Sequence, residues 1–88
     1  MSKSLFFTDN GWEDYLYWQK EDKKKLKRIN LLIEDVRRNG NLNGIGKPEA
    51  LKGNLQGFYS RRIDSEHRLV YRVTNQYVEI LQCRYHYS

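Results

Sequence analysis

Three strand-like segments follow one another in the second half of the chain, and they restrict the possible fold more than any other feature. Their sequences are FYSRRI at residues 58–63, HRLVYRVT at residues 67–74 and YVEILQCRY at residues 77–85. The turns between them, at residues 64–66 and 75–76, are of hairpin length, which favours antiparallel pairing of consecutive strands. A two-residue loop at 75–76 would place Arg72 opposite Glu79 as a cross-strand charge pair. The sequence therefore predicts an antiparallel sheet.

Residue types alternate along these strands as they do in a sheet with one buried face. The apolar side chains gather on one predicted face, which carries Leu69, Tyr71, Val73, Val78 and Ile80. The opposite face is mixed and basic, and it carries Arg68, Val70, Arg72, Leu81 and Cys83. We expect helices to cover the first face, and the second face to form a half-covered basic groove.

The first half of the chain predicts a short strand and two helices. SLFF at residues 4–7 has strand character, and Asn10 and Glu13 have the spacing of a helix capping box. One face of the first helix carries Trp12, Tyr15, Leu16 and Gln19. Asp22 opens the second helix, which ends before Gly40 and whose apolar stripe contains Leu26, Ile29, Ile33 and Val36. A glycine-rich loop at 39–48 and a helical turn at 49–55 complete the prediction.

These elements predict an α+β fold, in which two N-terminal helices pack on a small, mainly antiparallel twisted sheet. The 88 residues leave room for one domain, residues 1–88. Cys83 is the only cysteine, so no internal disulfide can form and a reducing compartment is expected. Neither a signal peptide nor a membrane-spanning segment is recognisable, and we therefore predict a cytoplasmic protein without a membrane partner.

The chain is basic, with 16 Lys and Arg against 11 Asp and Glu and a net charge of +5. This excess favours polyanionic partners, above all nucleic acid, although a basic protein without such a partner has the same charge. His67 and His86 stand nineteen residues apart with one cysteine between them, which is not the spacing of a metal site. We therefore expect no metal and no cofactor.

Side chains suited to RNA cleavage are concentrated in the second half of the chain. They are Glu49, Lys52, Arg61, Arg62, His67, Arg68, Arg84, His86 and Tyr87. The 2′-hydroxyl of RNA can attack its own neighbouring phosphate, so a protein need supply only a base, an acid and positive charge for the phosphate oxygens. Non-catalytic RNA-binding proteins contain similar residues, however, and this inventory alone leaves both functions open.

Four motifs, in their order and spacing, resemble those of one toxin family: GKPE from Gly46, SRRI from Ser60, EHRLVY from Glu66 and CRYHY from Cys83. Together with WEDYLYWQ near the N-terminus, they make the chain closely similar to the YoeB/Txe type of bacterial toxin, in the RelE-like superfamily. The resemblance extends over roughly residues 5–87. It implies a RelE-like fold and a metal-independent endoribonuclease that cleaves messenger RNA on the translating ribosome, leaving a 2′,3′-cyclic phosphate or a 3′-phosphate.

The resemblance also implies roles for individual residues. Glu49 would be the general base, His86 the general acid and Arg68 the ligand of the pentacovalent phosphate. Tyr87 would shape the leaving-group side, and the residues expected to hold phosphates are Lys52, Arg61, Arg62 and Arg84. His67 is a rival base, although a role in supporting the strand of Arg68 is favoured. Ala50 departs from the family pattern, in which a second proline often follows the glutamate.

The implied partners are messenger RNA on the ribosome and a cognate antitoxin of the YefM, Axe or Phd kind, with a homodimer also conceivable. We expect an acidic antitoxin segment to compete with RNA for the basic face, and the aromatic first helix or its groove to bind a partner that folds on binding. Two other functions remain open: a non-catalytic nucleic-acid-binding regulator, and a toxin of the same fold that acts on another target such as a topoisomerase.

One geometric problem arises from the predicted strands. Strict alternation places Arg68 on the same face as Cys83 and Tyr85, with His86 on the other. For Arg68 and His86 to reach one phosphate, the chain must bend or leave the sheet after about Cys83.

Overall fold

The structure is a computed structural model that describes residues 3–86 of the chain. Its elements are β1 (Ser4–Phe7), α1 (Asp9–Glu21), α2 (Lys23–Asn39), β2 (Glu49–Ala50), the short 3-10 helix η1 (Gly53–Leu55), β3 (Tyr59–Arg62), β4 (Arg68–Val73) and β5 (Tyr77–Gln82). The first strand, both helices and the three C-terminal strands were all predicted. The helical turn predicted at 49–55 is instead a two-residue strand followed by η1.

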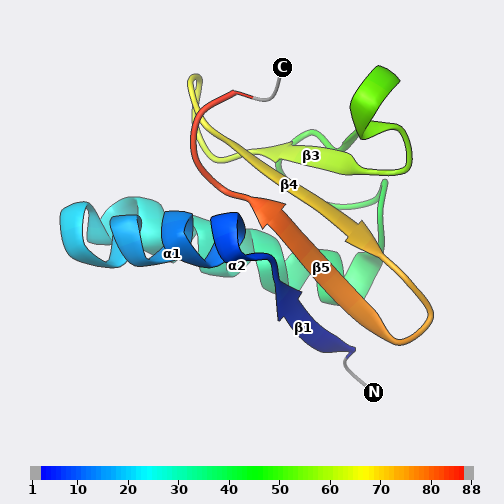
Figure 1. Cartoon of the computed structure of the whole chain (residues 1–88), viewed down its shortest axis with the longest axis horizontal. Helices are drawn as coiled ribbons and strands as arrows, with labels where there is room; N and C mark the ends of the chain where they lie inside the picture. The colour runs from blue at the N-terminus through cyan, green and yellow to red at the C-terminus, as the bar shows by residue number, and fades with distance from the viewer. Residues whose placement is uncertain (1–2, 87–88) are drawn as a thin grey trace.

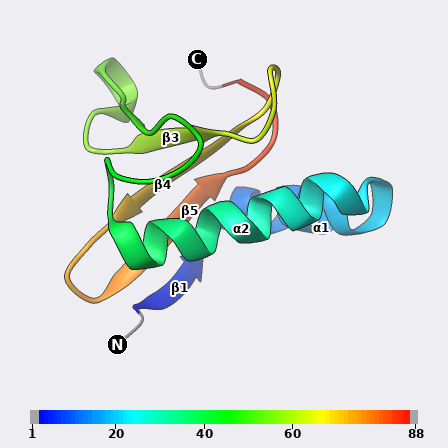
Figure 2. The same cartoon turned by 180° about the vertical axis from the view of Figure 1, so that it is seen from behind.

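The strands form one five-stranded sheet in the order β1-β5-β4-β3-β2. β1 runs parallel to β5, and the other neighbours are antiparallel, which confirms the predicted mainly antiparallel α+β fold. Figure 1 shows α2 passing behind β4 and β5, and Figure 2 shows the same helix in front of these strands from the opposite side. The predicted charge pair is also present, because Arg72 is paired with Glu79 and its Nη2 lies 2.8 Å from the carboxylate.

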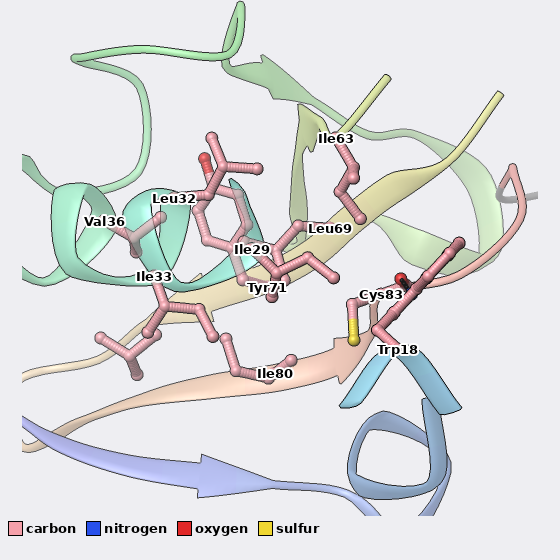
Figure 3. Close-up of a cluster of buried hydrophobic side chains, with 11 residues drawn as sticks. Trp18, Ile29, Leu32, Ile33, Val36, Ile63, Leu69, Tyr71, Ile80 and Cys83 are labelled. Carbon is pink, nitrogen blue, oxygen red and sulfur yellow. Dashed lines mark hydrogen bonds between the residues drawn. The ribbon is translucent and has the colours of Figure 1, made fainter. Parts of the chain in front are cut away.

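The hydrophobic core lies between α2 and the face of the sheet that α2 covers (Figure 3). Ile29, Leu32, Ile33 and Val36 of α2 are buried, which confirms most of the predicted stripe; Leu26 is only partly buried. They pack in one cluster with the side chains that the sheet contributes: Leu69, Tyr71, Val78 and Ile80. Burial of these apolar side chains is the main force that holds the helices on the sheet.

The predicted start of α1 is wrong. Thr8, not Asn10, caps the helix, because its Oγ1 accepts a hydrogen bond from the Gly11 N–H (3.0 Å). The buried side of α1 contains Gly11 and Trp18, whereas Trp12 remains 47% exposed. Gly11 lies so close to β5 that an added Cβ would be 2.5 Å from the Ile80 carbonyl oxygen. This close approach places the start of α1 directly against β5, while Trp12 and Leu16 of the predicted face remain partly in solvent.

The hydrogen bonds at both ends of α2 agree with the sequence. The Asp22 carboxylate accepts hydrogen bonds from the Lys24 and Lys25 N–H groups at the first turn, as an N-cap residue does. Gly40 follows the last turn with a φ of 87°, a conformation that glycine adopts without strain. No helix within residues 3–86 is long and apolar enough to span a bilayer.

A β-bulge changes the side-chain alternation of β5. Tyr71 is paired with Ile80, and the preceding residue Val70 is paired with Gln82, so Leu81 is an extra residue without a partner in the ladder. The predicted face of Cys83 is therefore wrong. The extra residue turns Cys83 towards the helices, where it is fully buried in the core cluster.

Candidate functional site

The sheet face opposite the helices, which we call the second face, carries most of the predicted site residues. Across this face Glu49 is paired with Ser60, Ser60 with Val70 and Val70 with Gln82. Side chains of directly paired residues project from the same face of a sheet. Glu49 of the short edge strand β2 therefore shares a face with β3 and β4, and its side chain is exposed.

Arg62 and Arg68 are directly paired on the same face, at the end of β3 and the beginning of β4. Like charges opposite one another in a sheet repel, and an anion between them relieves that repulsion. From the pairing register, Arg68 lies two strands and two residues from Glu49, about 12 Å between Cα atoms at ordinary sheet spacings. Long side chains can reach a common phosphate across such a gap.

The Arg68 guanidinium is held on one side only. Its Nη1 donates hydrogen bonds to the backbone carbonyls of Asp64 (2.8 Å) and His67 (3.1 Å). Nε and Nη2 have no hydrogen-bond acceptor within residues 3–86. Every fully buried side-chain nitrogen or oxygen in these residues has a hydrogen-bond partner, so Nε and Nη2 are not fully buried. This Nε–Nη2 edge therefore makes no hydrogen bond to the described protein and is partly accessible, although Arg68 as a whole is only 9% exposed. It is the planar fork that binds two oxygens of one phosphate.

Residues 83–86, which we call the tail, leave the sheet after β5 and pass beside the β3–β4 turn (Figure 1). α1 binds the start of the tail: the Cys83 N–H donates to Asp14 (3.1 Å), and Trp18 Nε1 donates to the Cys83 carbonyl (2.7 Å). The Tyr85 N–H donates to His67 Nδ1 (2.7 Å), and the Arg68 N–H donates to the Tyr85 carbonyl (3.0 Å). The chain therefore leaves the sheet after β5, which meets the condition that the sequence set for Arg68 and His86 to reach one phosphate.

His86 follows directly after the residue that is bound to Arg68, so the tail brings its backbone to the corner where Arg68 begins β4. Its side chain is exposed. Tyr85, the preceding residue, has a φ of 66°, which breaks the alternation of a strand and redirects the chain at this point. Tyr87, the fourth predicted catalytic residue, lies outside the described residues.

Arg61 is not available to RNA, contrary to our prediction. It is fully buried, and each of the five guanidinium N–H groups has an acceptor within the protein. These acceptors are the Tyr71 hydroxyl (2.9 Å), the Asp35 carboxylate, and the carbonyls of Gly40 (2.8 Å), Asn43 (2.6 Å) and Ile45 (3.0 Å). Because β-strand side chains alternate, Arg61 faces the helix layer when its neighbour Arg62 faces the second face. Its role is to fix the loop after α2.

The other two predicted phosphate ligands differ in their surroundings. Lys52 is exposed and precedes η1, close in sequence to Glu49. The Arg84 guanidinium instead stacks on the Tyr17 ring of α1, with its central carbon 3.4 Å from the ring centroid. The Arg84 guanidinium is therefore already engaged with α1.

Asp14 and Trp18, which fasten the tail, were not predicted as functional residues. Asp14 and Trp18 belong to α1, about seventy residues before their partners in the tail. Burial raises the pKa of the Asp14 carboxyl, while the hydrogen bond from the Cys83 N–H and the charge of Arg84 oppose this shift. No local pattern marks these residues, because their polar atoms are used only once the chain end reaches the helix.

Comparison with known proteins gives one family. Residues 7–87 match the model of the YoeB-like toxins of bacterial type II toxin–antitoxin systems. The chain is 57% identical to Toxin YoeB of Escherichia coli K12 over 83 residues, which are 94% of this chain and 98% of that protein.

The chain belongs to the YoeB-like toxin family.

Solved structures agree with this assignment. A chain from the YoeB dimer of Staphylococcus aureus superposes with a TM-score of 0.93 at 52% identity, covering 99% of the toxin described here and 100% of that chain. A chain from the heterotetrameric YoeB–YefM toxin–antitoxin complex of the same species superposes with a TM-score of 0.90, with the same identity and coverage. The RelE-like fold implied by the sequence is confirmed.

The toxin also has an apolar groove beside α1. Its volume is about 380 Å³, and it lies between β1, α1 and α2, lined by Leu5, Phe7, Trp12, Tyr15, Asn30, Ile33 and Glu34. The Trp12 and Tyr15 rings are stacked with centroids 5.7 Å apart and form one wall. This groove corresponds to the predicted surface beside the aromatic first helix.

The structure also bears on two other kinds of chemistry, a cysteine nucleophile and a bound metal ion. Burial raises the pKa of the Cys83 thiol far above its usual range, so this thiol does not form a nucleophilic thiolate near neutral pH. Among residues 3–86, no three His, Cys, Asp or Glu side chains lie together as a metal-binding group would require.

Proposed function

We propose that the toxin is a ribosome-dependent endoribonuclease that cleaves messenger RNA by attack of the 2′-hydroxyl on the adjacent phosphate. The observation that carries this proposal is the corner where three features meet. The open Nε–Nη2 edge of Arg68, the directly paired Arg62 and the tail that leads to His86 all lie there. A protein that only binds RNA needs positive charge but has no use for an ordered acid beside it.

In this mechanism Glu49 removes the proton from the 2′-hydroxyl, and the resulting oxyanion attacks the neighbouring phosphorus. Arg68 binds the extra negative charge on the phosphate oxygens, which is greatest in the pentacovalent transition state. His86 gives a proton to the 5′-oxygen as its bond to phosphorus breaks, and Tyr87 shapes that side of the site. The products are a 2′,3′-cyclic phosphate and a 5′-hydroxyl.

Lys52 and Arg62 would hold flanking phosphates, since both are exposed near this face. Neither needs to contact the reacting phosphate, because phosphate contacts mainly position a nucleic acid. Arg84 is a weaker candidate, as its guanidinium is engaged with Tyr17. We exclude Arg61 from the RNA contacts because it is fully buried.

We further propose that a cognate antitoxin of the YefM kind neutralises the toxin, as the relative from S. aureus forms a complex with YefM. An acidic segment of that antitoxin would compete with RNA for the paired arginines. A homodimer is proposed on the same basis, because the S. aureus relative forms one. Since ribosomes are the proposed target, we place the activity in the cytoplasm.

The test is cleavage of a defined message on purified, programmed ribosomes, followed by chemical analysis of the new ends. We expect a 2′,3′-cyclic phosphate or its hydrolysis product, a 3′-phosphate, on the upstream fragment. A 3′-hydroxyl with a 5′-phosphate on the downstream fragment would indicate attack by water and would refute this mechanism. Binding to ribosomes without cleavage would instead favour a non-catalytic role.

A further inference from the structure

His67 accepts a hydrogen bond that no sequence pattern predicted. The Tyr85 N–H donates to His67 Nδ1 at 2.7 Å, across eighteen residues of chain. A ring nitrogen that accepts a hydrogen bond is unprotonated, so in neutral His67 the proton is on Nε2. Both ring nitrogens are then occupied, one by the amide and the other by its own proton. A residue in this state has no nitrogen left with which to act as a general base.

The His67 ring is fixed from several sides. It packs edge-on against Trp18, with ring centroids 4.8 Å apart, and its side chain is only 13% exposed. Its backbone N–H donates to the Asp64 carboxylate at 2.7 Å, and its carbonyl accepts from the Ile63 N–H at 3.0 Å. Trp18 in turn donates to the Cys83 carbonyl. The Trp18–His67 pair therefore binds the tail at two successive points.

Tyr85 needs such support because its backbone is strained. A φ of 66° is in the left-handed region, which is unfavourable for a residue with a Cβ and persists only where the surroundings enforce it. The bond from its N–H to His67 and the bond from the Arg68 N–H to its carbonyl lie on either side of its Cα. Together they set the direction in which the chain continues to His86.

We propose that His67 is a positioning residue, which holds the Tyr85 amide through Nδ1 and so directs His86 towards the phosphate bound by Arg68. This inference rests on the proposed function for its effect on cleavage, whereas the hydrogen bond can be tested without any activity. His67 acts on the reaction only through the tail.

Two substitutions separate the hydrogen bond from the ring packing. His67→Asn keeps an acceptor oxygen at the δ position but loses the ring on Trp18. His67→Phe keeps a ring but has no acceptor. Glu66→Gln is the matched control, because Glu66 is an exposed neighbour whose carboxylate is 3.9 Å from His67 Nε2, the ring nitrogen that does not bind the Tyr85 amide.

The first measurement is hydrogen exchange of the Tyr85 amide, and the second is single-turnover cleavage on programmed ribosomes. In His67→Phe we expect the Tyr85 amide to exchange about tenfold faster, as for one lost hydrogen bond. Cleavage should fall about 10- to 100-fold, as for a misplaced catalytic group, with ribosome affinity unchanged. His67→Asn should restore most of the protection of the Tyr85 amide and most of the cleavage rate, and Glu66→Gln should resemble the wild type in both measurements.

The proposal would be overturned if His67→Phe had the same Tyr85 amide exchange rate and the same cleavage rate as the wild type. It would also be overturned if His67→Asn restored neither rate relative to His67→Phe. If His67→Phe does not fold, nitrogen NMR of the wild-type ring decides: an unprotonated Nδ1 is expected, and a protonated Nδ1 refutes it. A wild-type toxin that does not cleave would count against the proposed function only, since the exchange and NMR measurements would still test the contact with Tyr85.

Discussion

Arg61 and Arg68 are both buried arginines of the sheet, yet their surroundings differ in one decisive respect. Arg61, under the loop after α2, donates all five of its N–H groups to protein acceptors, including the Asp35 carboxylate. Arg68, at the corner below the tail, is held by Nη1 alone and keeps its Nε–Nη2 edge open. The protein alone satisfies every hydrogen-bond donor of Arg61, whereas it leaves donors of Arg68 available to a ligand.

The difference shows why burial alone is a poor guide to the role of an arginine. Arg61 is 0% and Arg68 9% exposed, so accessible area hardly separates them. Hydrogen bonds do separate them, because each guanidinium has a fixed number of donors, and the donors that the protein leaves unused are available to a phosphate. Substitutions at and around the two residues can test this contrast between a structural and a ligand-binding arginine.

The largest effect is expected from Arg61→Met. This change removes the positive charge beside Asp35 and leaves several loop carbonyls without donors. Loss of one partner of a buried ion pair costs about 3–5 kcal/mol of the free energy of unfolding. That is a large part of the stability of a small domain, and unfolding in urea would measure it. Arg62→Met, at the exposed neighbour, should change it by about 0.5 kcal/mol or less. Equal stability of the two variants would contradict a structural role for Arg61.

The next largest effect concerns Arg68→Lys, which keeps the charge but loses the planar fork. Single-turnover cleavage should fall about 10²- to 10³-fold, as it does when a transition-state hydrogen-bond donor is removed. The free energy of unfolding should change by only about 1 kcal/mol, because two hydrogen bonds to backbone carbonyls are altered. Wild-type cleavage by Arg68→Lys would reduce Arg68 to a general electrostatic contact.

A third prediction examines the tail itself. Truncation after Tyr85 removes His86 but keeps the hydrogen bonds that Cys83 and Tyr85 make with α1, His67 and Arg68. The shortened toxin should therefore melt close to the wild-type temperature and still bind its antitoxin, yet cleave at least about 10²-fold more slowly. Removal of Ser88 alone is the control and should have almost no effect. Near-normal cleavage after truncation would move the general acid elsewhere.

The smallest effect is a pH dependence of stability at the corner of Arg68. Burial opposes ionisation of Asp64, but hydrogen bonds from Lys25 and from the His67 and Glu66 N–H groups prevail and lower its pKa from 3.8 to about 2. A carboxyl whose pKa is lower in the folded state stabilises the fold above its unfolded pKa. That contribution is lost as the pH falls from about 4 towards about 2.

Asp64→Asn keeps an acceptor for the two backbone N–H groups and removes the titration. The wild type should be more stable than this variant at neutral pH, and the difference should shrink as the pH falls through that range. Urea unfolding at several pH values would measure it, with Glu66→Gln as the exposed control. A difference that is independent of pH would show that the Asp64 charge does not contribute.

Much of the fold could be predicted because its signals are local. Alternation identified β4 and β5, the hairpin at 75–76 gave the Arg72–Glu79 pair, and the stripe of α2 gave most of the helical side of the core. The start of α1 was placed wrongly, because Thr8 caps the helix while its own N–H donates to the Ile80 carbonyl of β5, a contact that exists only in the folded chain.

By itself, the sequence determined the fold class, the family and the residue types available for chemistry, since short-range periodicity and the order of motifs are properties of the chain. Tertiary structure alone decided which arginine is structural. Arg61 and Arg62 are adjacent and chemically identical, and only the position of the loop and of Asp35 distinguishes them. It also decided the direction of the tail, because one extra residue at Leu81 reverses the alternation, and Asp14, Trp18 and His67 then bind the tail. The physical reason is that a hydrogen bond forms only where two groups meet in space. The bonds from Asp14 and Trp18 to the tail join residues near opposite ends of the chain, so no local pattern can predict them.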